Sequence, residues 1–205
     1  MDILKYIALI EQASNENESE IEGLDRAIGD GDHFINLKRG IGAIHTMADQ
    51  LSTMTINEQF KMIGMKVLST VGGASGPLFA TFFLEMGKHI TDSKTSIQII
   101  AEAFSKAVDG IKQRGKSDVG QKTMLDVLIP VAAKFQELAS SNMSSHEIAS
   151  DINQFAIDCA HNTQDMLPSK GRSSGLGERA LGHIDPGAKS CQVMISAVCQ
   201  HIQGD

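Results

Sequence analysis

The sequence predicts an all-α protein, folded as an antiparallel up-and-down bundle of eight helices, and two observations support this prediction. Apolar residues recur at three- and four-residue steps along most of the chain, which is the spacing of one buried helix face. Signals for β-strands are nearly absent, because the 205 residues include no tryptophan, a single tyrosine and no sustained alternation of polar and apolar positions. This length suits one ordinary hydrophobic core, so we expect residues 1–205 to form a single domain.

Turn residues and apolar stripes place the helices in order along the chain. We expect them near residues 2–22, 33–51, 56–72, 75–91, 95–114, 124–140, 144–167 and 186–203. The clearest stripes mark the first helix (Ile3, Ile7, Ile10), the third (Phe60, Ile63, Val67), the fifth (Ile100, Ala103, Phe104, Ala107, Ile111) and the seventh (Ile148, Ile152, Phe155, Cys159).

Prolines support several of these boundaries and disturb one helix. Pro77 and Pro186 fall where the first turn of a helix tolerates proline, and Asp185 can cap the last helix. Pro168 closes the seventh helix. Pro130 lies inside the sixth helix, where it removes a backbone hydrogen bond, so we predict a kink there.

The composition argues against several classes of partner. With 25 acidic and 18 basic residues the formal charge is −7, which would repel nucleic acid and anionic lipid. Cys159, Cys191 and Cys199 form no CxxC pair, so they are expected to be buried thiols in a reducing cytoplasm. No stretch approaches the roughly 18 uninterrupted apolar residues of a membrane span. We therefore expect a cytoplasmic protein with no nucleic-acid or membrane partner.

The seven connectors between the expected helices fall into two classes. Connectors 49–55, 91–95 and 140–144 are short, polar and free of glycine, as plain turns are. Connectors 29–33, 72–77, 115–123 and 171–187 are rich in glycine and in groups that could bind a ligand. If short connections keep successive helices antiparallel, these four connectors emerge at one end of the bundle. The sequence therefore predicts a site in the loops at that end.

The first of these connectors could bind a metal ion. Asp30 and Asp32 project to one side of an extended loop, Gly31 lets the backbone bend between them, and Asp25 sits at the end of the preceding helix. Three carboxylates together repel one another unless a cation neutralises them, and hard oxygen ligands suit magnesium bridged to phosphate. Taken alone, so short a motif is better explained by a capped turn with its acids in water.

The other three connectors could hold an anionic ligand. The glycine-rich segment 72–76 precedes a helix and could cradle phosphate with its amides, or could be only a flexible turn, and it is not a Walker loop. Thr123 could cap the helix that follows it, while Met124 offers a soft surface for a purine or simply fills the core. Arg172 is a candidate for neutralising a phosphoryl group in transfer, whereas His183 is better explained as a structural hydrogen-bonding residue.

Four separated motifs in one order are similar to a known family. They are segments 24–33, 71–83 and 120–126, together with 171–174, 176–179 and 182–187. In these segments the chain resembles the ADP-binding subunit of dihydroxyacetone kinase, in the bacterial form driven by the phosphoenolpyruvate phosphotransferase system. The resemblance implies an eight-helix antiparallel barrel with ADP and two magnesium ions at one end, where the bound ADP is recharged to ATP by a phosphohistidine-carrying partner subunit. The phosphoryl group then passes to dihydroxyacetone on a second, dihydroxyacetone-binding subunit.

The resemblance also assigns residues to the site. It implies that Asp25, Asp30 and Asp32 bind the metal ions, and Arg172 remains the residue that we expect to be catalytic. The nucleotide contacts it implies are His33, Phe34, Ile35, Asn36, Ala74, Ser75, Gly115, Thr123, Met124, Arg172, Asp185, Pro186 and Gly187.

Two departures from the family pattern leave other functions open. Phe34 and Ile35 stand where the family has a glycine and a small or branched residue, and Gly175 stands where an aromatic residue is usual. One alternative is a kinase subunit that uses exchangeable ATP on another carried substrate, such as an acyl chain. Another is a nucleotide-loaded regulatory protein that docks to a transcription factor. The sequence leaves the oligomeric state open, a homodimer included.

Overall fold

The computed structural model describes residues 2–90 and 95–204, and this part of the chain is all-helical, with no β-strand. The α-helices are α1 (Ile3–Glu16), α2 (Glu18–Ile28), α3 (His33–His45), α4 (Ala48–Ser52), α5 (Ile56–Thr70), α6 (Ser75–His89), α7 (Ile97–Gly115), α8 (Leu125–Ala139), α9 (Ser145–Asn162) and α10 (Pro186–Gln203). Three short 3-10 helices, η1 (Thr163–Asp165), η2 (Arg172–Gly175) and η3 (Gly177–Ala180), lie between α9 and α10. The predicted all-α fold is confirmed.

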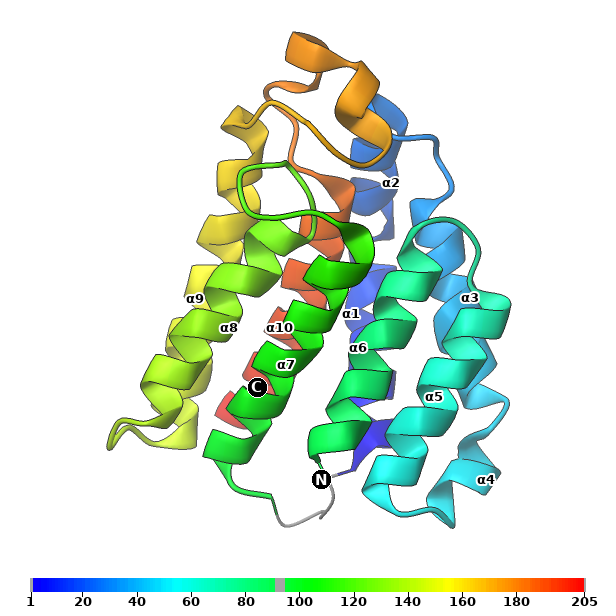
Figure 1. Cartoon of the computed structure of the whole chain (residues 1–205), viewed down its shortest axis with the longest axis vertical. Coiled ribbons are helices and arrows are strands. Elements are labelled where there is room, and N and C mark those ends of the chain that lie inside the picture. Colours follow the sequence, from blue (N-terminus) through cyan, green and yellow to red (C-terminus); the bar gives the residue numbers. More distant parts are fainter. Residues whose placement is uncertain (1, 91–94, 205) are drawn as a thin grey trace.

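Helices that follow one another in the chain pack against one another. From α5 to α10 each helix contacts the next, α10 contacts α1, and α3 contacts α5. The long helices lie side by side along the long axis of the molecule (Figure 1). One apolar cluster lies mainly among α7, α8, α9 and α10, and a second among α1, α3, α5, α6 and α7. Phe79, Phe82 and Phe104 pack against both clusters, so they join the two parts of the core.

The prediction of eight helices was wrong, because two of the expected helices are interrupted. The first divides at Asn17, whose side-chain amide donates to the carbonyl of Ala13 at 2.8 Å. Asparagine side chains compete in this way with the helical backbone pattern. The second ends at His45, where the Thr46 hydroxyl donates to the carbonyl of Ala43 at 2.7 Å, and α4 forms a separate turn after it. The described part of the chain therefore has ten α-helices.

Local signals at the helix ends agree better with expectation. Asp185 caps α10 by accepting a hydrogen bond from the amide of Ala188 at 2.8 Å, and Pro186 is the first helical residue. The helix expected to reach residue 167 ends at Asn162 and continues only as η1, before Pro168. Helix α8 runs through Pro130 without interruption, and the kink expected there stays a prediction.

The helical order places the connectors at two opposite ends of the molecule. The connectors before α3, α6, α8 and α10 all lie at one end, the upper end in Figure 1. We call this the connector end. The turns before α5 and α9 lie at the opposite end, while most of the expected connector 91–95 falls outside the described residues. None of the described helices is both long enough and apolar enough to span a membrane.

Candidate functional site

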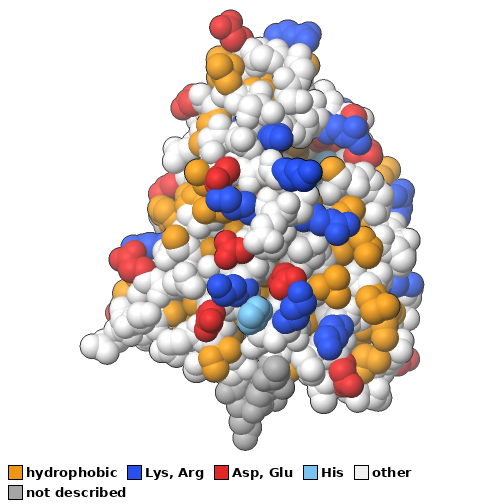
Figure 2. Space-filling model, in the orientation of Figure 1, with side chains coloured by type: hydrophobic (Ala, Val, Ile, Leu, Met, Phe, Trp, Pro, Cys, Tyr) orange, Lys and Arg blue, Asp and Glu red, His pale blue; other side chains and the backbone are white. Residues whose placement is uncertain are grey.

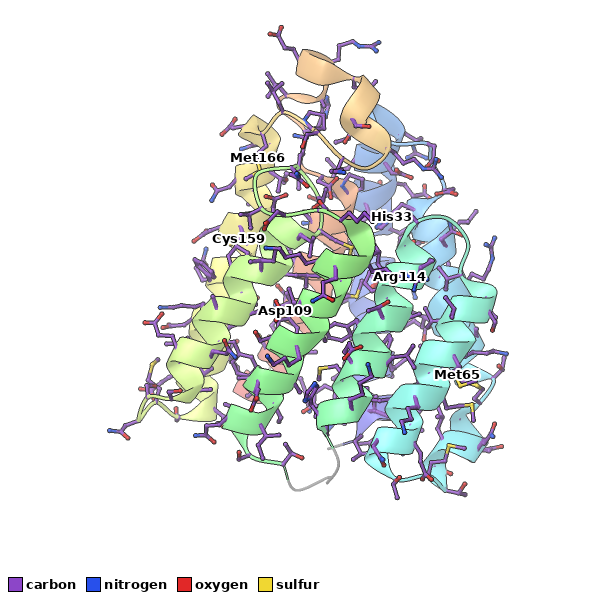
Figure 3. All side chains as sticks on the ribbon, viewed as in Figure 1. His33, Met65, Asp109, Arg114, Cys159 and Met166 are labelled. Atoms are coloured by element: carbon purple, nitrogen blue, oxygen red, sulfur yellow. The ribbon has the colours of Figure 1, made fainter. Side chains whose placement is uncertain are left out.

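A cavity of about 460 Å³ opens at the connector end. All four glycine-rich connectors contribute to its wall, and α2 and α7 supply residues from their last turns. Figure 3 shows two of the lining residues, His33 and Arg114, near the same end of the helices. A volume of this order is typical of small-molecule sites in proteins. The prediction that these connectors gather at one end is therefore met by a cavity that they share.

Three carboxylates form a cluster on this wall. Asp25, Asp30 and Asp32 each offer an oxygen atom, and these atoms all lie within 4.8 Å of one another. The Asp25 side chain is buried, and its Oδ2 accepts a hydrogen bond from the amide of His33 at 2.9 Å. A Cβ atom at residue 29 would overlap the Asp25 carboxylate, so Gly29 is the residue that leaves room for it. The connector is thus built to hold a carboxylate at the back of the cluster.

One cation reaches the cluster from across the cavity. The Nε atom of Arg172, in η2, lies 2.8 Å from Oδ2 of Asp30. Both side chains are largely exposed, so this ion pair contributes little to stability by itself. The ion pair matters for position, because it shows that the last connector places a guanidinium beside the acidic cluster.

His33 ties the start of α3 to α10. Its Nε2 lies 2.7 Å from the hydroxyl oxygen of Ser190, and that hydroxyl donates to the carbonyl of Pro186 at 3.0 Å. Because the serine proton is engaged, Nε2 is the donor to Ser190 and Nδ1 keeps its lone pair. Burial lowers the pKa of His33, against the opposing effect of Asp25, Asp32 and Asp30. The imidazole is therefore neutral near pH 7 and serves to hold two cavity walls together.

Four helices begin at the cavity and present their N-terminal ends to it. Residues at the starts of α3, α6, α8 and α10 line the wall, namely His33, Ser75, Leu125 and Pro186. The first amides of a helix have no partner within the helix, and the helix dipole makes this end partly positive. Four such ends around one cavity favour an anionic ligand.

The turn before α6 is shaped for close approach of a ligand. Gly73 has φ of +69°, which favours glycine, and Gly73, Ala74 and Ser75 all line the cavity. A Cβ atom at residue 76 would overlap the carbonyl of Val71, so only glycine fits this tight turn. The backbone of this segment, and not a large side chain, therefore faces the cavity.

The starts of α8 and α10 adjoin each other. Met124 lies on the cavity wall and also belongs to the apolar cluster around α8, so it fills the core and presents a surface to a ligand at once. A Cβ atom at Gly187 would lie 3.5 Å from Cβ of Met124. Burial raises the pKa of Asp185 to about 7, Asp126 adds to the rise, and the hydrogen bond from Ala188 and the charge of Lys122 oppose it.

Most of the residues expected at the site line this cavity, and three do not. The lining set includes Asp25, Asp30, Asp32, His33, Ala74, Ser75, Gly115, Thr123, Met124, Arg172, Asp185, Pro186 and Gly187. Phe34 is buried beneath the start of α3, Ile35 is 57% exposed, and Asn36 is buried and accepts a hydrogen bond from Arg39. These three follow His33 around the helix, and successive helical side chains point in different directions. Their contact with a ligand stays a prediction.

Several lining residues were not named one by one from the sequence, although half of them lie in the connectors that were expected to form the site. They are Ile28, Gly29, Gly73, Pro77, Leu78, Ile111, Arg114, Ser117, Leu125, Lys170, Gly171 and Ser173. Arg114 and Lys170 each precede a glycine of an unusual connector, and this position could have marked them. Figure 2 shows lysine and arginine side chains on the connector end of the face in view.

Comparison with known proteins agrees with this geometry. The DAK2 domain family matches residues 27–200. The chain is 35% identical over 197 residues to the ADP-binding subunit DhaL of PEP-dependent dihydroxyacetone kinase 1 from Listeria innocua, covering 96% of this chain and 94% of the relative. It is 39% identical over 181 residues to the ADP-binding subunit DhaL of the PEP-dependent dihydroxyacetone kinase from Escherichia coli, covering 87% and 86%.

A solved structure has a similar fold. The crystal structure of the dihydroxyacetone kinase from C. freundii in complex with AMP-PNP and Mg²⁺ superposes with a TM-score of 0.76 at 22% identity. The match covers 97% of this chain and 33% of that larger one. With a family match over most of its length and relatives of similar size, this chain belongs to the DAK2 domain family, in the group of DhaL subunits of PEP-dependent dihydroxyacetone kinases.

Proposed function

We propose that this chain is the nucleotide-binding subunit of a dihydroxyacetone kinase that holds magnesium-bound ADP as a cofactor. It would accept a phosphoryl group from a phosphohistidine on one partner subunit and pass it to dihydroxyacetone on another. The names of the relatives support this reading. The observation that carries it is a single cavity in which an acidic cluster faces the N-terminal ends of four helices. Such a cavity suits an anionic ligand that binds together with a metal cation.

The acidic cluster fits magnesium. Asp25, Asp30 and Asp32 supply oxygen atoms alone, which are the ligands that magnesium prefers. Arg172 offsets only part of their charge. We assign these three aspartates to two magnesium ions, which when bound would neutralise the charge of a nucleotide diphosphate.

The remaining walls fit the nucleotide. The amides at the start of α6, which no side chain caps, are placed for phosphate oxygens, and the glycines beside them keep side chains out of the way. Met124 and Leu78 offer apolar surface for the base. His33 links the start of α3 to α10 through Ser190, so two walls of the cavity are joined by a hydrogen bond.

Arg172 has the position expected of a residue that acts during transfer. It extends from a loop across the cavity to the metal-binding carboxylates, where a guanidinium can neutralise charge that develops on a moving phosphoryl group. The other lining residues hold and orient the reactants. Phosphoryl transfer asks mainly for positioning and charge neutralisation, so the hydroxyl acceptor can remain on the partner subunit.

Release of the bound ligand tests this function. The purified chain is denatured, and the soluble fraction is analysed for nucleotide by chromatography and for magnesium by atomic emission. We expect about one ADP per chain, together with magnesium. The freshly purified chain should then carry phosphate to dihydroxyacetone when both partner subunits and phosphoenolpyruvate are supplied. A chain that releases no nucleotide and binds ATP weakly and reversibly would instead favour a kinase subunit with exchangeable ATP.

A further inference from the structure

We propose that Lys122 is a positioning residue of the nucleotide site, which fastens both ends of the connector that carries Arg172 to the start of α8. The inference rests on the proposed function for what the site binds. The fastening itself rests on contacts within the chain. Lys122 belongs to the connector before α8 and its side chain does not line the cavity, so it would act through its neighbours.

The side chain of Lys122 is fully buried and hydrogen-bonded to the backbone. Its relative exposure is 0%, which is rare for lysine. The Nζ atom donates to the carbonyl of Thr163 at 2.6 Å and to the carbonyl of His183 at 2.7 Å, and lies 3.4 Å from the carbonyl of Gln164. One ammonium group therefore joins the end of α9 to the chain just before α10.

These contacts close the base of a long loop. The amide of Gly182 donates to the carbonyl of Gln164 at 2.9 Å, and the amide of Asp185 donates to the hydroxyl of Thr163 at 3.0 Å. The loop of residues 166–181 extends beyond this base and includes η2 and η3, at the top of Figure 1. Arg172 in this loop reaches Asp30 on the far wall. The contacts of Lys122 at the base of the loop therefore determine the direction in which the loop extends.

The backbone of Lys122 adds an independent indication that the side chain is needed. Its φ of +57° lies in the left-handed region, which disfavours residues other than glycine. Glycine would adopt this conformation without strain. Lys122 has a strained backbone and a fully buried side chain. Its presence here is explained if its ammonium makes contacts that glycine could not make.

The charges around Lys122 are arranged to keep an ammonium in place. Burial lowers the pKa of Lys122, while Asp185, Asp165 and Asp126 oppose that change. An apolar replacement would leave the carbonyl of His183 without this donor and the carbonyl of Thr163 with only the amide of Met166, and these acids would lose a nearby cation. Groups buried without their partners are costly, so the loop base would open to water.

Lys122 also stands between two segments of the cavity wall. Thr123 and Met124 follow it directly, and Asp185 to Gly187 begin two residues after the carbonyl of His183 that it binds. Loosening this contact would therefore displace the starts of α8 and α10 as well as Arg172. A residue that served stability alone, elsewhere in the core, would not have this effect.

A graded series of variants tests the inference. Lys122→Arg keeps a buried cation with several donors, Lys122→Gln keeps a neutral donor, and Lys122→Met keeps neither. Leu51→Ala is the control, since Leu51 is fully buried in α4 at the opposite end and its truncation lowers stability without touching the loop. All variants are first compared by circular dichroism, and their stabilities are measured.

The first readout is trypsin cleavage after Lys170, Arg172 and Arg179, mapped by mass spectrometry without added nucleotide. We expect cleavage in this loop to rise from Arg to Gln to Met, reaching about tenfold or more over the unaltered chain, and to stay unchanged in Leu51→Ala. The second readout is affinity for magnesium-ADP after removal of bound nucleotide. It should fall about tenfold or more in Lys122→Met, as the loss of charged hydrogen bonds predicts, and recover most of that loss in Lys122→Arg.

The outcomes separate this inference from the proposed function. Cleavage at the unaltered rate in both Lys122→Gln and Lys122→Met would overturn it, as would an equal loss of affinity in Leu51→Ala. If Lys122→Met does not fold, the comparison of Lys122→Gln with Lys122→Arg decides in the same way. If the unaltered chain itself binds no magnesium-ADP, the proposed function fails, and the cleavage series still tests whether Lys122 fastens the loop.

Discussion

Asp185 should make the stability of this protein fall as pH rises from acid to neutral. Its carboxylate caps α10 at the half-buried cavity wall, and desolvation by burial raises its pKa from 3.8 to about 7. Because the folded pKa lies above the unfolded one, folding takes up a proton between these two values. The free energy of unfolding that depends on this group is therefore greatest below about pH 4 and is lost as pH rises through about 7.

The size of this effect follows from the shift. At about 1.36 kcal/mol per unit of pKa, a change from 3.8 to about 7 corresponds to an upper limit of about 4 kcal/mol. Asp185→Asn removes the ionisation and retains an oxygen that can accept the amide hydrogen of Ala188. The variant should therefore match the unaltered chain near pH 4 and exceed its stability near pH 8, by an amount up to that limit.

Urea unfolding at several pH values measures this difference. The nucleotide-free forms of the unaltered chain and Asp185→Asn are compared between about pH 4 and pH 8, and the free energy of unfolding is obtained by linear extrapolation. The difference between the two proteins should grow with pH over this range. A variant that is destabilised equally at every pH would refute the reasoning, because it would mean that the carboxylate acts only as a helix cap.

Three further variants test the site itself. Asp30→Ala should retain less than about a tenth of the nucleotide, because Asp30 completes the acidic cluster, and its helical content should not change, because Asp30 lies in an exposed loop. The retained nucleotide is measured by denaturation and chromatography, and unchanged retention would show that Asp30 does not belong to the metal site. Arg172→Ala should slow transfer by about 100-fold while changing ADP affinity little, and equal losses in single-turnover and binding assays would assign the arginine to ground-state binding. Gly29→Ala should lower both stability, by about 1–3 kcal/mol, and magnesium-ADP affinity, because the added Cβ displaces Asp25; calorimetry that finds neither loss would show that the connector can adjust.

The end of the molecule at which the cavity lies could be predicted because it depends on features that one sequence carries. Helical spacing identified the helices, and glycines identified which connectors are unusual. Antiparallel packing then placed alternate connectors at one end, where the cavity lies. Asp185 and Pro186 also defined the start of α10, because capping and first-turn proline are local effects.

Other features depend on contacts that are distant in the chain. The break at Asn17 needs only one side-chain hydrogen bond, and asparagine occurs in many uninterrupted helices, so the residue alone does not predict the break. The buried position of Lys122 depends on the carbonyls of Thr163 and His183, which lie 41 and 61 residues away. The direction of Phe34 depends on where α3 begins, and helix ends are the least certain part of a prediction from sequence.

The separation of connectors between two ends also bears on how this protein could vary. The turn 140–144 joins α8 to α9 at the end opposite the cavity, and it supplies none of the cavity's lining residues. Lengthening a surface turn costs only about 0.6 kcal/mol for each doubling of its length. Insertions there can therefore accumulate in evolution, or carry a reporter peptide, without disturbing phosphate handling, whereas the glycine connectors have little freedom to change length.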